Sequence, residues 1–151
     1  MYFASEKALE DFLIQHPQIT ELRIENSPGL KHMPRLPESL VKLQVLRCWC
    51  LPALNQLPVN LRSLTVSNCS LVPGLPELPD GLTFLQVDNC LGLSGLPALP
   101  ETLAVLRLIN VPGLKRLPAL PSALAGLIFD SCPALKNGGL KAGNLAIELR
   151  L

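Results

Sequence analysis

The chain has few aromatic residues, few histidines and no excess of charge of either sign. Aromatic side chains make up 4% of its 151 residues, and only two histidines are present. The 13 basic and 12 acidic side chains leave a net charge of +1, which lacks the positive excess typical of nucleic-acid-binding proteins. No apolar run approaches the ~18 residues of a membrane-spanning helix. We therefore expect no nucleic-acid partner and no membrane span.

The first residues and the cysteines bear on the compartment. The start, MYFASEKALEDF, lacks the basic and apolar regions of a Sec signal peptide. The five cysteines are an odd number, and none forms a Cys-x-x-Cys pair, which favours a reducing environment. We expect a cytoplasmic protein, or one secreted into a host cell without a Sec signal peptide.

Proline and apolar residues, leucine above all, are abundant. The chain has 15 prolines, and 48% of its residues are hydrophobic. A high proline content is compatible with disorder, but disordered chains lack this apolar content. Leucine and proline also recur together, as in GLPELPDGLTFLQVDNC at 74–90 and GLPALPETLAVLRLINV at 95–111. An ordered fold with an irregular, proline-rich backbone is therefore expected.

The recurrence has a period of 21 residues. Several columns keep this spacing with no insertion over more than a hundred residues. One apolar column contains Leu22, Leu43, Leu64, Leu85, Leu106 and Leu127. A second column, five residues later, contains Ser27, Cys48, Cys69, Cys90, Val111 and Cys132. The Leu-Pro pairs follow the same spacing at 36–37, 57–58, 78–79, 99–100 and 120–121.

Each unit reads L-x-x-L-x-L-x-x-C-x-x-L-x-x-L-P-x-L-P and resembles the leucine-rich repeat. The resemblance implies an α/β-type repeat solenoid, mostly β: a right-handed leucine-rich-repeat solenoid with a parallel sheet on its concave face. It divides the chain into a capping segment at 1–18, six repeats at 19–145 and a terminal strand at 146–151.

Elementary geometry agrees with that arrangement. In LTFLQVDNC, Leu85 and Val87 point to one side of a strand, while Phe84, Gln86 and Asp88 point to the other. One coil cannot bury its leucines alone, so stacked coils pair their strands in a parallel sheet. Proline donates no hydrogen bond and favours extended backbone, so we expect a convex side that is extended and polyproline-like rather than helical.

The two ends depart from the repeat. SEKALEDFLIQHP predicts a short capping helix with Ser5 as N-cap, Pro17 as stop, and one apolar face made of Leu9, Phe12 and Leu13. At the other end Lys141 and Ala142 replace Leu-Pro, and Glu148 replaces the strand leucine. The alternation in LAIELRL still predicts a last strand, in a slipped register.

The Leu-Pro-x-Leu-Pro signature looks like that of leucine-rich-repeat effectors that bacteria inject into host cells by type III secretion. Many of those effectors carry a ubiquitin-ligase domain with a catalytic cysteine in a Cys-x-Asp setting, which this sequence lacks. The repeats of plant immune receptors are also similar, and match better in the cysteine column. The resemblance implies a non-enzymatic module that recognises a partner protein. Two alternatives stay open: the recognition fragment of a larger ubiquitin ligase, or a structural unit that forms a homodimer through its C-terminal edge.

No residues predict a catalytic site, a cofactor or a metal. His16 falls at a helix end and His32 in a loop. The Cys-Trp-Cys at 48–50 invites a metal or redox interpretation, but Cys48 belongs to the repeat column and Cys50 to a turn. Cysteines stacked at one strand spacing are close enough to pair oxidatively. The simpler interpretation is a ladder of reduced core thiols.

The outward side chains of the strands form the surface that the repeat leaves free to vary. Arginine with apolar and aromatic residues is the composition of protein-binding hot spots. The asparagine column after the strands is interpreted as turn residues that bond neighbouring backbone, with ligand contact as the alternative. Apolar residues on this face have a structural alternative too, cross-strand packing. The predicted partner-binding residues are Arg23, Glu25, Gln44, Leu46, Arg47, Trp49, Phe84, Gln86, Asp88, Val105, Arg107 and Ile109.

Overall fold

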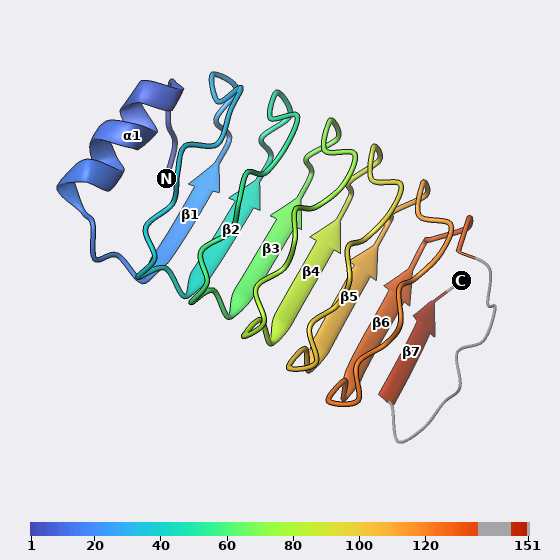
Figure 1. Cartoon of the computed structure of the whole chain (residues 1–151). Helices are drawn as coiled ribbons and strands as arrows, with labels where there is room; N and C mark the ends of the chain where they lie inside the picture. Colours follow the sequence, from blue (N-terminus) through green and yellow to red (C-terminus); the bar gives the residue numbers. More distant parts are fainter. Residues whose placement is uncertain (136–145, 151) are drawn as a thin grey trace.

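The computed structural model describes residues 1–135 and the backbone of 146–150. One helix, α1 (Glu6–Gln15), precedes seven strands in one parallel sheet whose order follows the sequence (Figure 1). The strands are β1 (Glu21–Glu25), β2 (Lys42–Leu46), β3 (Ser63–Ser67), β4 (Phe84–Asp88), β5 (Val105–Ile109), β6 (Gly126–Asp130) and β7 (Ala146–Arg150).

The 21-residue period of the sequence is the register of the sheet. Leu22 pairs with Leu43 and Leu43 with Leu64, and the same offset continues to β6. Between β6 and β7 the offset is 20, because Leu127 pairs with Ile147. The slipped register of the last strand is thus confirmed. The Lys141 and Ala142 that replace Leu-Pro lie outside the described residues.

Each coil turns twice, once at each end of its strand. After the strand comes the sequence Cys-x-x-Leu, in which the leucine N–H donates to the cysteine carbonyl oxygen. In the fourth coil, for example, Leu93 donates to Cys90 at 3.1 Å. Before the next strand, Pro-x-x-Leu closes in the same way, as Leu103 does to Pro100 at 3.0 Å. The backbone between the two turns is neither helix nor strand, and no residue from 16 to 135 is helical. The predicted extended convex side is confirmed.

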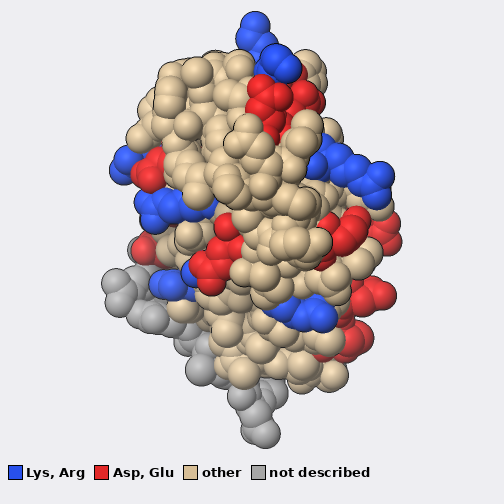
Figure 2. Space-filling view, turned by 90° about the vertical axis from the view of Figure 1, so that its left-hand side faces the viewer, with Lys and Arg blue, Asp and Glu red and all other residues tan. Residues whose placement is uncertain are grey.

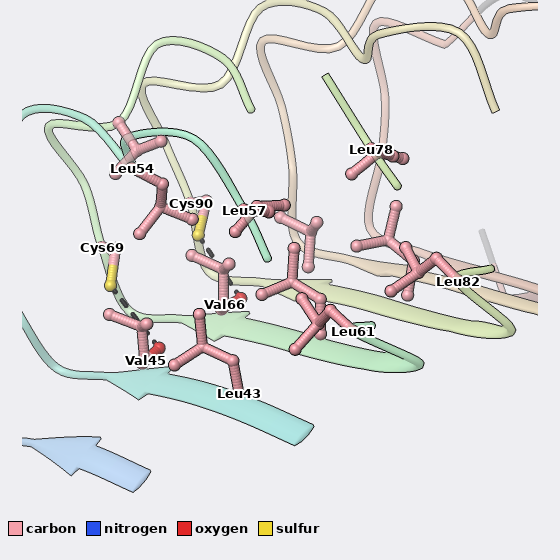
Figure 3. Packing of buried hydrophobic residues seen from close by; sticks show 14 of the residues in the cluster. Leu43, Val45, Leu54, Leu57, Leu61, Val66, Cys69, Leu78, Leu82 and Cys90 are labelled. Carbon is pink, nitrogen blue, oxygen red and sulfur yellow. Dashed lines mark hydrogen bonds between the residues drawn. The ribbon is translucent and has the colours of Figure 1, made fainter. Parts of the chain in front are cut away.

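The core is one continuous cluster, mostly of leucine and valine, that runs through the stacked coils (Figure 3). Leu43, Leu64 and Leu85 are fully buried, as are the valines two residues after each of them. Burying one such side chain contributes about 1.5–3 kcal/mol. Since each coil places its leucine against the leucine of the next coil, this stabilisation exists only between stacked coils.

The cysteine column connects neighbouring coils. The Sγ of Cys69 donates to the carbonyl oxygen of Val45 at 3.7 Å, and that of Cys90 donates to Val66 at 3.6 Å (Figure 3). Burial raises the pKa of the Cys69 thiol to about 12, and it also raises the pKa of Cys90. All five cysteines are free thiols. A thiol at this position is therefore a small apolar side chain with one weak donor.

The N-terminal cap has two parts, of which the sequence indicated one. Helix α1 begins after Ser5, whose side chain accepts the N–H of Ala8 at 3.2 Å, and it buries Leu9 and Leu13 against the first coil. The predicted helix and N-cap are confirmed.

The second part is the segment before the helix, which covers the exposed edge of β1. The amino group of Met1 donates to the carbonyl oxygen of Arg23 at 2.7 Å, and the N–H of Glu25 donates to the carbonyl oxygen of Met1 at 2.8 Å. The N–H of Phe3 donates to the buried hydroxyl of Ser27 at 2.9 Å. Ser27 takes the place of cysteine in the first coil, where it accepts a hydrogen bond that a sulfur would accept weakly.

Candidate protein-binding face

The outward side chains of β1–β6 form the concave face of the sheet. Three positions of each strand point outward and two point into the core, which gives the alternating burial of strands such as β4. The outward positions align in three rows because the strands pair without any slip from β1 to β6. Rows of varied side chains on a regular sheet make a rigid surface that can be adapted to a partner.

Ten of the twelve predicted residues lie at outward strand positions. β1 contributes Arg23 and Glu25, and β2 contributes Gln44 and Leu46. The remaining six are Phe84, Gln86 and Asp88 on β4, and Val105, Arg107 and Ile109 on β5. The strand β3, between the two groups, contributes none of the predicted residues.

Arg47 and Trp49, the other two predicted residues, lie beyond the end of β2 and not on the strand itself. Trp49 occupies the turn after Cys48 and is 50% exposed. The alternation of a strand does not extend past Leu46, because the backbone at Arg47 enters the left-handed region with φ 54°. Both side chains belong to the turns at the carboxyl edge of the sheet.

The same left-handed conformation explains the asparagine column. Asn26, Asn68, Asn89 and Asn110 have φ between 50° and 55°, a region that asparagine tolerates better than most residues. In this column the backbone N–H of the residue donates to the next strand, as the N–H of Asn89 does to the carbonyl oxygen of Ile109 at 2.9 Å. The side chains of Asn68, Asn89 and Asn110 bond to other side chains instead, which corrects the expectation that they bond to the backbone. Asn89 Nδ2, for example, donates to Asp88 Oδ1 at 2.8 Å.

Charges at the β1 end of the face are paired within the chain. Arg23 Nη2 lies 2.8 Å from Glu25 Oε2, and Arg47 Nη1 lies 3.5 Å from Glu25 Oε1. Lys42 Nζ lies 3.5 Å from Glu21 Oε2. Exposed pairs of this kind contribute little to stability and are readily exchanged for other partners.

Arginine and apolar side chains lie together on β4 and β5. Phe84, Val105 and Ile109 are half-buried at outward positions. Arg107 lies among them, and its Nε is buried without a hydrogen-bond partner in the part of the chain that the structure describes. Arginine beside apolar and aromatic side chains is a combination enriched among residues that contribute strongly to protein binding.

Over β3 the face is hollowed. The outward side chains of this strand are all small, and the space above them, about 430 Å³, is bounded by larger residues of β2 and β4. The sequence-based prediction included residues of β2 and β4 but none of the three outward residues of β3, because it favoured large side chains. The available signal was the run of serine and threonine at alternate positions. The residues around the hollow are Lys42, Gln44, Leu46, Ser63, Thr65, Ser67, Phe84 and Gln86.

The two histidines lie near α1, away from the column of stacked cysteines. His32 Nδ1 lies 2.9 Å from Glu6 Oε1, and this hydrogen bond lowers the pKa of Glu6. The ring of His16 packs against Phe12 with 4.5 Å between centroids. Among the described residues, no three histidine, cysteine or acidic side chains are placed to hold a metal ion. His16 therefore ends the N-terminal cap, and His32 contacts that cap from the first coil.

The surface has no region of one charge where it can be seen from the α1 side. Figure 2 shows lysine and arginine interspersed with aspartate and glutamate over this view. Within the described residues, no helix is long and apolar enough to cross a membrane.

Comparison with known proteins agrees with this geometry. The chain is similar in structure to YopM from Yersinia enterocolitica WA-314, with a TM-score of 0.50 and 27% sequence identity. The fold is a leucine-rich-repeat solenoid. The match covers 74% of this chain and 31% of YopM, so this repeat solenoid spans about a third of that protein's length. Neither a protein-family model nor a curated protein matches the sequence.

Proposed function

We propose that the chain is a non-enzymatic recognition module that binds a partner protein through its concave face. The observation that carries the proposal is the contrast between the two sides of the sheet. Inward positions from Leu22 to Phe129 hold buried apolar residues in every coil, whereas outward positions change from strand to strand. Since the fold places no common demand on the outward positions, the apolar residues and the arginine found there support a binding role.

Site-specific photo-crosslinking tests the proposal. A benzophenone amino acid replaces Phe84 or Arg107 on the concave face, or the exposed Ala119 on the convex side as a matched control. Both concave positions should crosslink to the same protein in a host-cell extract, and position 119 should not. That protein, once purified, should bind the chain in calorimetry and bind Phe84→Asp at least about tenfold more weakly. Equal labelling from all three positions would contradict the proposal.

We propose further that this module belongs to a secreted bacterial effector. Its Leu-Pro-x-Leu-Pro repeats resemble those of such effectors, and the structural likeness is to a Yersinia protein. A translocation reporter fused to the protein should enter host cells from a bacterium with an active type III secretion apparatus. Entry that does not depend on the apparatus would contradict this assignment.

Self-association is a second candidate function, favoured by the position of β7 at the edge of the described sheet. Among the described strands, β7 pairs with β6 on one side only, and an unpaired edge is a template for another chain. Light scattering after size exclusion should then give a mass that rises toward the dimer with concentration. A monomer at every concentration would remove this candidate.

A further inference from the structure

The hollow over β3 has the form of a trough that runs along the strand. The register places three outward rows side by side across β2, β3 and β4. In each row a small β3 residue lies between two residues of the neighbouring strands. The rows are Lys42–Ser63–Phe84, Gln44–Thr65–Gln86 and Leu46–Ser67–Asp88. We call this set of nine residues the β3 trough; eight of them line the hollow, and Asp88 lies beside it at the end of the third row.

The width of the trough selects an extended occupant. Strands lie about 4.8 Å apart, so the walls on β2 and β4 stand roughly 10 Å apart between backbones. The wall side chains take up part of that space, and an α-helix is itself about 10–12 Å wide. A helix would rest on the walls without reaching Thr65. A single extended chain is narrow enough to lie between the walls, above Thr65 and Ser67, which are themselves only 9% and 8% exposed. β3 has five residues at about 3.3 Å each, so four or five residues of the occupant fit along it.

The middle of the trough offers uncommitted hydrogen-bonding groups. Gln44 and Gln86 face each other across Thr65, and each amide can both donate and accept. Within the described part of the chain, no hydrogen bond occupies these two amides or the hydroxyl of Ser63. Ser67, by contrast, is committed, since it donates to Asp88 Oδ2 at 3.1 Å and accepts from Asn68 at 2.8 Å. The two free amides of the middle row, and the free hydroxyl of Ser63 in the row beside it, can bond the backbone groups of an extended peptide.

The two ends of the trough carry opposite charges. Lys42 stands at the end where the strands begin, and its contact with Glu21 at 3.5 Å joins two exposed side chains, so the pair is weak and exchangeable. Asp88 stands at the other end, and hydrogen bonds from Ser67 and Asn89 hold its carboxylate in place. An occupant complementary to the trough therefore carries an acidic side chain near Lys42 and a basic one near Asp88.

We propose that the β3 trough binds an extended segment of the partner protein, with an acidic and a basic residue about four positions apart. The segment lies along β3, its charges meet Lys42 and Asp88, and its apolar side chains contact Leu46 and Phe84. The proposal rests on the proposed function, because it names the kind of partner segment that the concave face recognises.

A random heptapeptide library displayed on phage tests the proposal on the whole chain. Selection on the wild-type protein should enrich peptides with one acidic and one basic residue at that spacing. Selection on Lys42→Glu should enrich peptides with two basic residues instead. Lys115→Glu, an exposed charge reversal on the convex side, should keep the wild-type preference. All three proteins are first shown to have the same thermal midpoint. Failure to enrich the charged pattern, or a pattern that Lys42→Glu leaves unchanged, would overturn the proposal.

A second measurement separates the trough from the rest of the concave face. The enriched peptide, labelled with a fluorophore, is titrated against Thr65→Phe, which fills the trough, and Ile128→Phe, which enlarges a side chain on β6. Thr65→Phe should weaken binding by at least about tenfold, and Ile128→Phe by less than about twofold. The reverse ranking would overturn the trough while leaving concave-face recognition intact. Binding lost only through convex substitutions such as Ala119→Trp would overturn both.

Discussion

The thiol of Cys69 donates to the carbonyl oxygen of Val45, which lies 24 residues earlier in the chain but directly below it in the stack. Cys132 makes the same contact to Leu108 at 3.6 Å. Val111 occupies this column in the coil between Cys90 and Cys132 and has no donor to offer. The column therefore requires a small buried side chain, while the thiol hydrogen bond adds to the contact where it is present.

Thiol reactivity should separate the cysteines by burial. Cys50 is exposed, whereas Cys48, Cys69 and Cys90 are buried and their thiol pKa is raised by that burial. Because the thiolate is the reactive form, a disulfide reagent at pH 8 should titrate Cys50 at once and the buried three only after denaturation. Peptide mapping identifies the modified residue. Rapid loss of Cys69 in the folded protein would contradict the burial.

The raised thiol pKa also predicts a loss of stability in alkali. The Cys69 thiol has its pKa raised from 9.0 to about 12 in the folded protein. Its contribution is therefore full below pH 9 and decreases as the pH rises toward 12, since only the unfolded chain releases that proton. Urea midpoints at pH 7 and pH 10 measure the decrease. The control variant is Cys69→Val, because Val111 already occupies the same column in another coil. This variant should reduce the difference between the two midpoints. An unchanged difference would refute the assignment of the effect to Cys69.

Neighbouring positions on β4 should respond oppositely to the same substitution. Leu85 is fully buried, and Leu85→Asp places an unpaired charge between two coils, so cooperative unfolding should disappear. Phe84 points outward, and Phe84→Asp should keep a cooperative transition and a native circular dichroism spectrum. Urea titration followed by circular dichroism compares the two. Similar unfolding in both variants would show that the faces of the strand are assigned incorrectly.

The asparagine column should depend on backbone conformation more than on its side-chain contacts. Asn89 has φ 50°, a conformation that costs other non-glycine residues about 1–3 kcal/mol. Asn89→Ala should lower the free energy of unfolding by about 1–2 kcal/mol, while Asn89→Gly, which tolerates this φ, should lose less. Urea unfolding measures both values. If glycine were as damaging as alanine, the side-chain bonds to Asp88 and Asn110 would be the dominant effect.

A glycine in the first coil should be sensitive to one added methyl group. A Cβ at Gly29 would collide with the backbone carbonyl of Ala4 in the segment that covers β1, whereas one at Gly95 would meet nothing within 4 Å. Gly29→Ala should therefore destabilise the protein by about 1–3 kcal/mol, and Gly95→Ala should change stability by less than about 0.5 kcal/mol. Thermal unfolding of the pair is sufficient, and equal midpoints would count against the docking of the N-terminal segment.

Period and side-chain type were enough to predict the solenoid. Equal spacing of Leu22, Leu43 and Leu64 predicts equal steps between strands, because only stacked coils can bury such a pattern, and the register reproduces it residue for residue. The same local logic predicted α1 from Ser5 and its apolar face. These are the features that depend on contacts between equivalent positions.

The tertiary structure alone decided where strands end and what covers the open edge. The letters after Leu46 do not mark where β2 stops, but the left-handed backbone at Arg47 ends the strand and leaves Trp49 in the turn that follows. Met1 and Phe3 carry no repeat signal, yet they bond along β1 because its edge groups require partners. The β3 trough likewise arises from differences in side-chain size across three strands, which become neighbours only when the coils stack. A repeated sequence specifies the contacts between equivalent positions of neighbouring coils. The ends of strands and the hollow depend instead on contacts between positions that are not equivalent.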